Sequence, residues 1–273
     1  MIGVFDSGVG GLSVWKELVA LMPGQRYLYV SDSGFCPYGP RPKSYVIDRC
    51  KKISEFLIEN GADIIVVACN TATAASIEVL RSLYNIPFVG MEPAVKPAAL
   101  QSETGVIGVL ATQGTLKGEL YLRTLHKFAA NTRVIEQVGN GLVELVESGN
   151  TESVEALELI RSYIAPMVDS GADHIVLGCT HYPFLSAAIQ KIAGEKIKIV
   201  NPAPAIAKQA KTLLGRIGKT IDLSVGNNQF YTTGGNGLLM EKMVSDVVSD
   251  LRREGRLQSD LYVRENRFCS IDI

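Results

Sequence analysis

The fold is decided by the segment GADIIVVACNTA, residues 61–72. Its centre is a short apolar run rich in Ile and Val, which is typical of a buried strand in a parallel sheet. The run ends at Cys69, and a helical pattern begins almost at once. The segment therefore predicts a strand-to-helix turn that carries a cysteine.

The chain contains this segment twice. Residues 171–181 read GADHIVLGCTH, which places Cys179 110 residues after Cys69. A second pair of segments also matches, because IGVFDSG (2–8) is similar to IGVLATQG (107–114). Self-similarity on this scale indicates duplicated domains rather than a short-period solenoid. We expect two related halves, each with one cysteine at a strand tip.

Short apolar runs alternate with longer periodic segments, so we expect an α/β fold in which mostly parallel sheets are flanked by helices. Pro-rich segments near 92–97 and 201–204 are read as crossings between domains. The predicted division is a first domain of 1–93 plus 205–273 and a second of 94–204. Other predictions are single helices over 115–128 and 183–193, a strand within 223–232, and an edge strand in 260–273.

Composition limits the function classes. The chain has 273 residues, 47% hydrophobic and 20% charged, with a net charge of −1. This is a globular profile without the basic surface that nucleic acid or an anionic membrane requires, so we expect neither partner. No apolar run reaches transmembrane length, and the sequence opens directly on an apparent strand, which predicts a cytoplasmic protein.

The cysteines and histidines give no metal motif. Five scattered cysteines fit a reducing compartment, and neither C-x-x-C nor H-E-x-x-H occurs, so no metal is predicted. Cys36, Cys50 and Cys269 are interpreted as packing residues. His174 is expected in the core and His126 on a helix surface.

Small polar residues follow the predicted strands. Ligands of open α/β sheets bind beyond the carboxyl ends of strands, where helix N-termini favour anions and lower thiol pKa values. We therefore interpret both repeated cysteines as reactive. The residues at these positions are Asp6, Ser7, Cys69, Asn70, Thr71, Thr112, Cys179, Thr180 and His181.

Residues 6–11, DSGVGG, also follow a strand. Their spacing differs from the G-x-G-x-x-G of dinucleotide-binding proteins, and no acidic residue clearly closes the next strand. Glycines that let the backbone approach a small carboxylate explain the segment equally well.

Two like thiols on opposite sides of one carbon can invert a stereocentre, because one takes a proton while the other returns it. A thiol–disulfide couple also needs two cysteines, although it usually uses C-x-x-C.

Four motifs resemble those of glutamate racemases, in the cofactor-independent aspartate/glutamate racemase family. They are DSGVGGL (6–12), PYG (37–39), ACNTA (68–72) and GCTHYP (178–183), and the resemblance runs from residue 2 to about 234. It implies two α/β domains with the active site in the cleft between them, and neither pyridoxal phosphate nor a metal.

The resemblance also implies roles for individual residues. Cys69 would act on D-glutamate and Cys179 on L-glutamate, assisted by Asp6 and His181. The implied substrate-binding positions are Asp6, Ser7, Tyr38, Gly39, Asn70, Thr71, Thr180, His181 and, as a further acid, Glu147.

The implied function is cofactor-independent interconversion of L- and D-glutamate, which supplies D-glutamate for peptidoglycan in a bacterial cytoplasm. A possible homodimer is the expected assembly. The alternatives are a racemase of aspartate or another amino acid, a non-catalytic carboxylate-binding protein, and a hydrolase or lyase that uses one cysteine as nucleophile.

Overall fold

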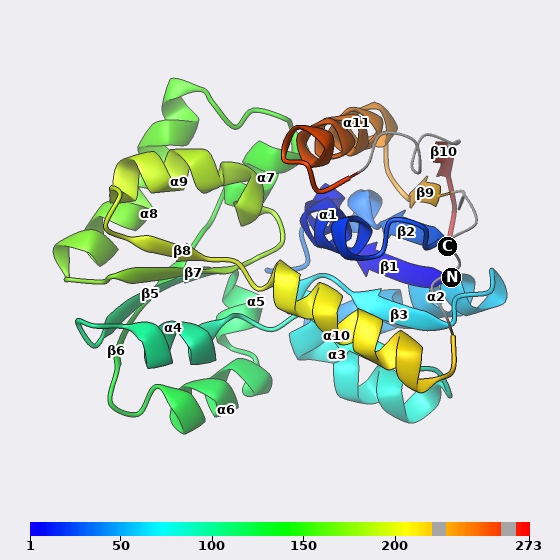
Figure 1. Cartoon of the computed structure of the whole chain (residues 1–273), viewed down its shortest axis with the longest axis horizontal. Coiled ribbons are helices and arrows are strands. Elements are labelled where there is room, and N and C mark those ends of the chain that lie inside the picture. The colour runs from blue at the N-terminus through cyan, green and yellow to red at the C-terminus, as the bar shows by residue number, and fades with distance from the viewer. Residues whose placement is uncertain (220–227, 258–265) are drawn as a thin grey trace.

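The computed structural model describes residues 1–219, 228–257 and 266–273. Its strands form two parallel sheets that lie side by side (Figure 1). The first sheet contains β1 (Ile2–Asp6), β2 (Tyr27–Ser31), β3 (Ile64–Val67), β4 (Phe88–Gly90), β9 (Asn228–Thr232) and β10 (Asn266–Ser270). The second contains β5 (Val106–Ala111), β6 (Arg133–Val138), β7 (His174–Gly178) and β8 (Lys198–Val200). The predicted α/β class with two similar parts is confirmed.

The order of the strands in each sheet agrees with how deeply each strand is buried. It is β10-β9-β2-β1-β3-β4 in the first sheet and β6-β5-β7-β8 in the second, and every pairing is parallel. The inner strands β1, β2, β3 and β7 are buried along their whole length, as expected for apolar runs covered on both faces. The edge strands β6, β8 and β10 are more exposed.

Helices cover both faces of each sheet. On the first sheet, α1 (Leu12–Leu21), α10 (Ala203–Arg216) and α11 (Gly237–Arg253) pack on one face, and α2 (Lys43–Glu59) and α3 (Asn70–Leu83) on the other. On the second, α8 (Val154–Asp169) and α9 (Ser186–Ala193) lie opposite α4 (Val95–Gln101) and α6 (Glu119–Phe128). One apolar cluster includes residues of both sheets, from Val4 in β1 to Leu177 in β7.

Short elements complete the chain between the sheets. They are the helices α5 (Gln113–Leu116) and α7 (Leu142–Glu147) and the 3-10 turns η1 (Val9–Gly11), η2 (Ser33–Phe35) and η3 (Tyr182–Leu185). Each follows the carboxyl end of a strand, since η1, η2, α5, α7 and η3 come after β1, β2, β5, β6 and β7.

Two predicted helix boundaries were wrong, and one helix was not predicted. The single helix over 115–128 is two helices, because the chain turns at Lys117 and Gly118. The helix over 183–193 begins as the 3-10 turn η3 before α9. No helix was predicted around Pro97, where the structure has α4; Pro97 is tolerated because it stands in the first turn, where an N–H has no partner within the helix.

The C-terminal part returns to the first sheet. The described part of the strand predicted within 223–232 is β9, and residues 220–227 lie outside the described residues. The edge strand expected in 260–273 is β10, which stands at the end of the sheet order. The domain limits at 93 and 205 stay predictions.

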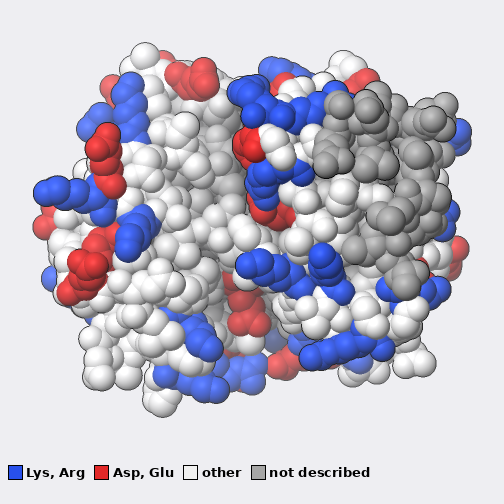
Figure 2. Space-filling model, in the orientation of Figure 1, with Lys and Arg blue, Asp and Glu red and all other residues white. Residues whose placement is uncertain are grey.

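None of the helices in the described ranges combines the length and the apolar character needed to cross a bilayer. On the face drawn in Figure 2, Lys and Arg are interspersed with Asp and Glu instead of gathering in one area.

Candidate active site

The carboxyl ends of β3 and β7 meet at one small cavity. Cys69 follows β3 and Cys179 follows β7, so each sheet contributes one thiol to the lining of the same cavity. The cavity has a volume of about 10 Å³, and both cysteines are buried. Its lining consists of Ser7, Pro37, Tyr38, Gly39, Cys69, Asn70, Thr71, Thr112, Val143, Cys179, Thr180 and His181.

Cys69 begins helix α3. Its sulfur accepts a hydrogen bond from the Ala72 N–H at 3.4 Å, and its thiol donates to Ser7 Oγ at 3.7 Å. We expected the helix N-terminus to lower the pKa of this thiol, but burial, followed by the charge of Asp6, raises it well above its usual value. That expectation was wrong, because one N–H contact does not offset full burial. Cys69 is a protonated thiol at neutral pH.

Cys179 stands at the end of a chain of polar contacts. Its sulfur lies 3.8 Å from His181 Nδ1, and His181 Nε2 lies 2.6 Å from Glu147 Oε1. Burial alone would lower the pKa of His181, yet hydrogen bonds with Cys179, Cys36 and Glu147 raise it well above its usual range. Burial likewise opposes ionisation of Glu147, but the contacts with His181, Val9 and Asn236 lower its pKa. Glu147 and His181 therefore form a charged pair beside Cys179.

Glu147 is held from two other parts of the chain. The Val9 N–H donates to Oε1 at 2.7 Å, and the Asn236 side chain donates to Oε2 at 2.8 Å. Asn236 directly precedes α11, so a residue of the C-terminal part of the chain holds the carboxylate of Glu147 in place. Glu147 and Asp6 lie behind the cavity wall rather than in its lining.

Asp6 joins the two halves. This fully buried carboxylate accepts from Thr180 Oγ1 at 3.0 Å and from the Gly8 N–H at 3.1 Å. Burial raises the pKa of Asp6, while His181 and these hydrogen bonds oppose the increase. Its contacts therefore place Asp6 beside the segment that carries Cys179.

The other predicted binding residues lie around the thiols. Neither Asn70 Nδ2 nor Asn70 Oδ1 has a hydrogen-bond partner in the described structure, although the side chain is buried. Thr71 Oγ1 lies 2.8 Å from Thr112 Oγ1. The Tyr38 hydroxyl bonds to Asp32, which also pairs with Arg49, and Tyr38 lines the cavity. A buried amide without partners is costly and suits a ligand with polar groups.

The glycines of residues 6–11 serve the protein's own side chains. A Cβ at Gly8 would lie 1.8 Å from Glu147 Oε1, and one at Gly10 would lie 2.3 Å from His181 Nδ1. We expected these glycines to admit a ligand carboxylate, but the carboxylate that approaches Gly8 is that of Glu147.

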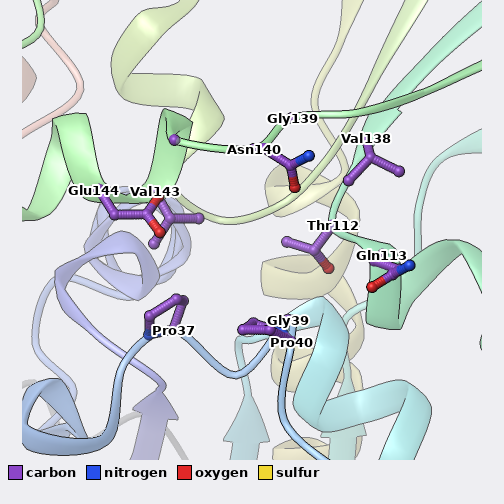
Figure 3. A pocket seen from close by; sticks show the side chains of 11 residues that line it. Pro37, Gly39, Pro40, Thr112, Gln113, Val138, Gly139, Asn140, Val143 and Glu144 are labelled. Atoms are coloured by element: carbon purple, nitrogen blue, oxygen red, sulfur yellow. The ribbon is translucent and has the colours of Figure 1, made fainter.

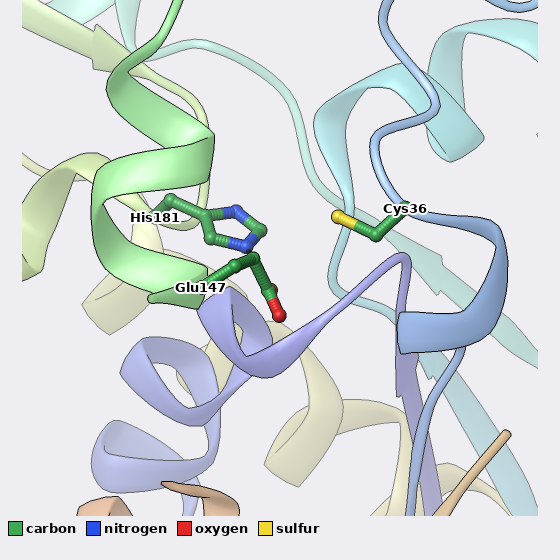
Figure 4. A group of neighbouring side chains, drawn as sticks. All are labelled: Cys36, Glu147 and His181. Atoms are coloured by element: carbon green, nitrogen blue, oxygen red, sulfur yellow. Dashed lines mark hydrogen bonds and ion pairs between the residues drawn. The ribbon is translucent and has the colours of Figure 1, made fainter. Parts of the chain in front are cut away.

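Two residues of this region were missed by the sequence reasoning. Cys36, which we assigned to packing, places its sulfur within 4.8 Å of ligand atoms of Glu147 and His181 (Figure 4). Cys36 directly precedes the PYG motif (37–39), and this position could have indicated that it lies near the site. Nothing in the sequence around Asn236 indicates a role in the site.

The remaining titratable predictions lie elsewhere. His174 is in the core as expected; its Nδ1 lies 2.8 Å from Asp173 Oδ1, and its Nε2 has no partner in the described structure. His126 is exposed on α6, also as expected.

A second cavity, of about 130 Å³, opens beside the first (Figure 3). It shares Pro37, Gly39, Thr112 and Val143 with the cysteine cavity. Loops from both halves face each other across it, with Pro40 on one side and Asn140 on the other.

Comparisons with known proteins agree with this arrangement. The sequence is 46% identical over 213 residues to a glutamate racemase of Herpetosiphon aurantiacus, covering 78% of this chain and 84% of that protein. The structure superposes on a glutamate racemase isoform of Bacillus anthracis with a TM-score of 0.82 at 30% identity, covering 100% of this chain and 97% of the other. An Escherichia coli glutamate racemase, solved with L-glutamate and the activator UDP-MurNAc-ala, gives a TM-score of 0.82 at 28% identity over 99% of this chain and 97% of the other.

The pattern of the Asp/Glu/hydantoin racemase family matches residues 10–210, which include both cysteine segments. The chain therefore belongs to the Asp/Glu/hydantoin racemase family and is an amino-acid racemase.

Proposed function

We propose that this racemase interconverts L- and D-glutamate by proton transfer at Cα between Cys69 and Cys179, without a cofactor. The observation that carries the proposal is that both thiols line one cavity while coming from different sheets. Substrate between them would present opposite faces of Cα to the two sulfurs. Glutamate is favoured because the relatives named above are glutamate racemases.

The raised pKa of Cys69 supports a direction in which Cys69 begins as the thiol. Cys179, acting as a thiolate beside His181, removes the Cα proton of L-glutamate and becomes a thiol. The Cys69 thiol gives its proton to the opposite face and becomes a thiolate, which completes D-glutamate. The reverse reaction uses the other protonation state, so one sulfur must always carry the proton that the other lacks.

Binding would use neutral donors. Among the residues that line the cavity, none is Lys or Arg. We propose that the substrate carboxylates and ammonium are held by the unpartnered amide of Asn70, by the hydroxyls of Ser7, Thr71 and Thr180, and by N–H groups at the start of α3. Excluding water strengthens these contacts as charge develops at Cα.

The test is cofactor-free racemisation followed by circular dichroism, with L-glutamate and L-aspartate assayed in parallel. We expect turnover of glutamate, and a loss of kcat by about 10²–10⁴-fold in Cys69→Ser and in Cys179→Ser. Cys269→Ser, at an exposed position in β10, is the matched control. Full activity in either cavity variant would remove that cysteine from the mechanism. Turnover of aspartate alone would transfer the proposal to that amino acid.

D-Glutamate made this way would serve peptidoglycan synthesis in a bacterial cytoplasm. Binding of glutamate without turnover would instead support a carboxylate-binding protein, and a trapped covalent adduct on one cysteine would support a hydrolase or lyase. A homodimer stays a prediction that sedimentation can check.

A further inference from the structure

Cys36, Glu147 and His181 form a cluster at the back of the active site. One ligand atom from each lies within 4.8 Å of the other two. They come from three segments: the loop after η2, the last residue of α7 and the turn after β7. Figure 4 shows the Cys36 sulfur directed toward His181 and Glu147 across the gap between these segments. His181 lies beside Cys179 and contacts Glu147, whereas Cys36 has no part in the proton transfer proposed above.

This donor set fits one class of ion. A thiolate, an imidazole and a carboxylate together are typical ligands of Zn²⁺, whereas Mg²⁺ and Ca²⁺ prefer oxygen alone. Donor atoms around one zinc stand about 2.0–2.3 Å from the ion, hence roughly 3–4 Å from one another. The observed separations therefore require only small side-chain shifts.

The surrounding contacts also indicate which atoms would bind. His181 Nε2 lies 2.6 Å from Glu147 Oε1, so these are the two atoms that one ion would contact together. The other ring nitrogen, Nδ1, faces Cys179. The Val9 N–H and the Asn236 amide hold the Glu147 carboxylate in place. Supporting hydrogen bonds of this kind orient metal ligands and commonly raise affinity.

We propose that Cys36, Glu147 and His181 bind a single Zn²⁺ ion, and that this ion inhibits the racemase. Zinc on Nε2 replaces the hydrogen bond between His181 and Glu147 and fixes the imidazole. The fixed imidazole, whose Nδ1 lies 3.8 Å from the Cys179 sulfur, can then no longer adjust its position during proton transfer at Cys179. The binding site stands on geometry alone, whereas its inhibitory effect rests on the proposed function.

Binding is tested on the purified full chain with Zn²⁺ and Co²⁺ as probes. Competition with a chromophoric chelator should give one zinc per chain, and Co²⁺ should give a thiolate-to-cobalt charge-transfer band. Cys36→Ser should lower zinc affinity by at least about tenfold and remove the band. Glu147→Gln should lower the affinity too. Cys69→Ser, which removes a thiol of the cavity but not of the cluster, should keep both signals.

Two outcomes overturn the site. One is an unchanged cobalt band in Cys36→Ser; the other is loss of the band in Cys69→Ser, which would place the metal between the two cavity thiols. Should Cys36→Ser fail to fold, the cobalt spectrum of the unaltered protein and the affinity of Glu147→Gln still decide the matter, and absence of a thiolate band would contradict the proposal.

Inhibition is measured separately. Zn²⁺ should reduce the rate of glutamate racemisation reversibly, with recovery on adding a chelator, and Cys36→Ser should need at least about tenfold more zinc relative to its own uninhibited rate. Zinc binding at the cluster with an unaffected rate would overturn the inhibitory part. Zinc binding in a protein that does not racemise glutamate would instead contradict the proposed function.

Discussion

At the scale of single residues, the two thiols differ in their surroundings although the segments that carry them are similar. Cys69 is buried against Ser7 and the start of α3, whereas Cys179 has His181 and then Glu147 beside it. The similar segments diverge at the residues after each cysteine, Asn70 in one and Thr180 in the other. The two thiols therefore have different hydrogen-bond partners although the strands before them are repeated.

Gly10 tests whether the position of His181 matters. A Cβ at this glycine would overlap the imidazole, so Gly10→Ala must displace His181 from Cys179. We expect kcat to fall by at least about tenfold, in the range that proton-transfer groups contribute. Gly215→Ala in α10 is the matched control, since a Cβ there meets nothing within 4 Å. It should keep its activity and gain roughly 0.5–1 kcal/mol in unfolding free energy. Equal activity of both variants would contradict the role of His181.

At the scale of secondary structure, the sequence was sufficient where burial alone decides. The apolar runs predict buried strands at β3 and β7, because a strand covered on both faces must be apolar throughout. It failed at Pro97 and at Gly118, where the same residue types either start, end or interrupt a helix depending on neighbours that are distant in the chain.

Some residues of the candidate active site could likewise be predicted from the sequence, and others could not. Cys69 and Cys179 could be predicted because each follows a strand in a repeated segment. The hydrogen bonds that hold the Glu147 carboxylate could not be predicted, because its partners Val9 and Asn236 lie 138 and 89 residues away in the chain. The packing of η1 against α7 and the position of Asn236 directly before α11 bring them together in the folded chain.

Asp173 joins β7 to the loop before β5, and it offers a pH-dependent test of stability. Its carboxylate accepts from Ser102 Oγ at 2.8 Å and from the Glu103 and Thr104 N–H groups at 2.6 and 3.0 Å. Although burial opposes it, these bonds and the one from His174 hold the pKa of Asp173 well below its usual value of 3.8. We expect Asp173→Asn to lose about 1–3 kcal/mol of unfolding free energy at pH 7.

The pH dependence has a definite sign. A lowered pKa in the folded state stabilises the protein above the unfolded pKa of aspartate, and this contribution is lost as pH falls through the folded value. The difference between the unaltered chain and Asp173→Asn, measured by urea unfolding, should be constant near neutrality and shrink below about pH 4. A difference that grows on acidification would contradict this account.

At the scale of the whole molecule, the two halves must separate to admit substrate. The cysteine cavity of about 10 Å³ is no larger than the roughly 10–15 Å³ that one water requires, so an amino acid cannot enter it as it stands. The adjoining cavity of about 130 Å³ lies between loops of both halves and leads toward it. We infer that the structure is a closed form and that glutamate enters along this path.

Hydrogen exchange can detect this opening. Without substrate, residues 37–42 and 138–143, on the two sides of the wider cavity, should exchange faster than the core strands. Saturating glutamate should slow their exchange by stabilising the closed form, while α8 serves as the internal control. Identical exchange of both loops with and without glutamate would contradict opening at this place.

The central claim is that two thiols act on opposite faces of one carbon, and early racemisation of L-glutamate in D₂O tests it most directly. After chiral separation, mass spectrometry should find deuterium at Cα in the first D-glutamate formed, while the remaining L-glutamate should still carry protium. Product that retains the original proton, or unreacted L-glutamate that gains deuterium as fast as product appears, would contradict transfer between Cys69 and Cys179.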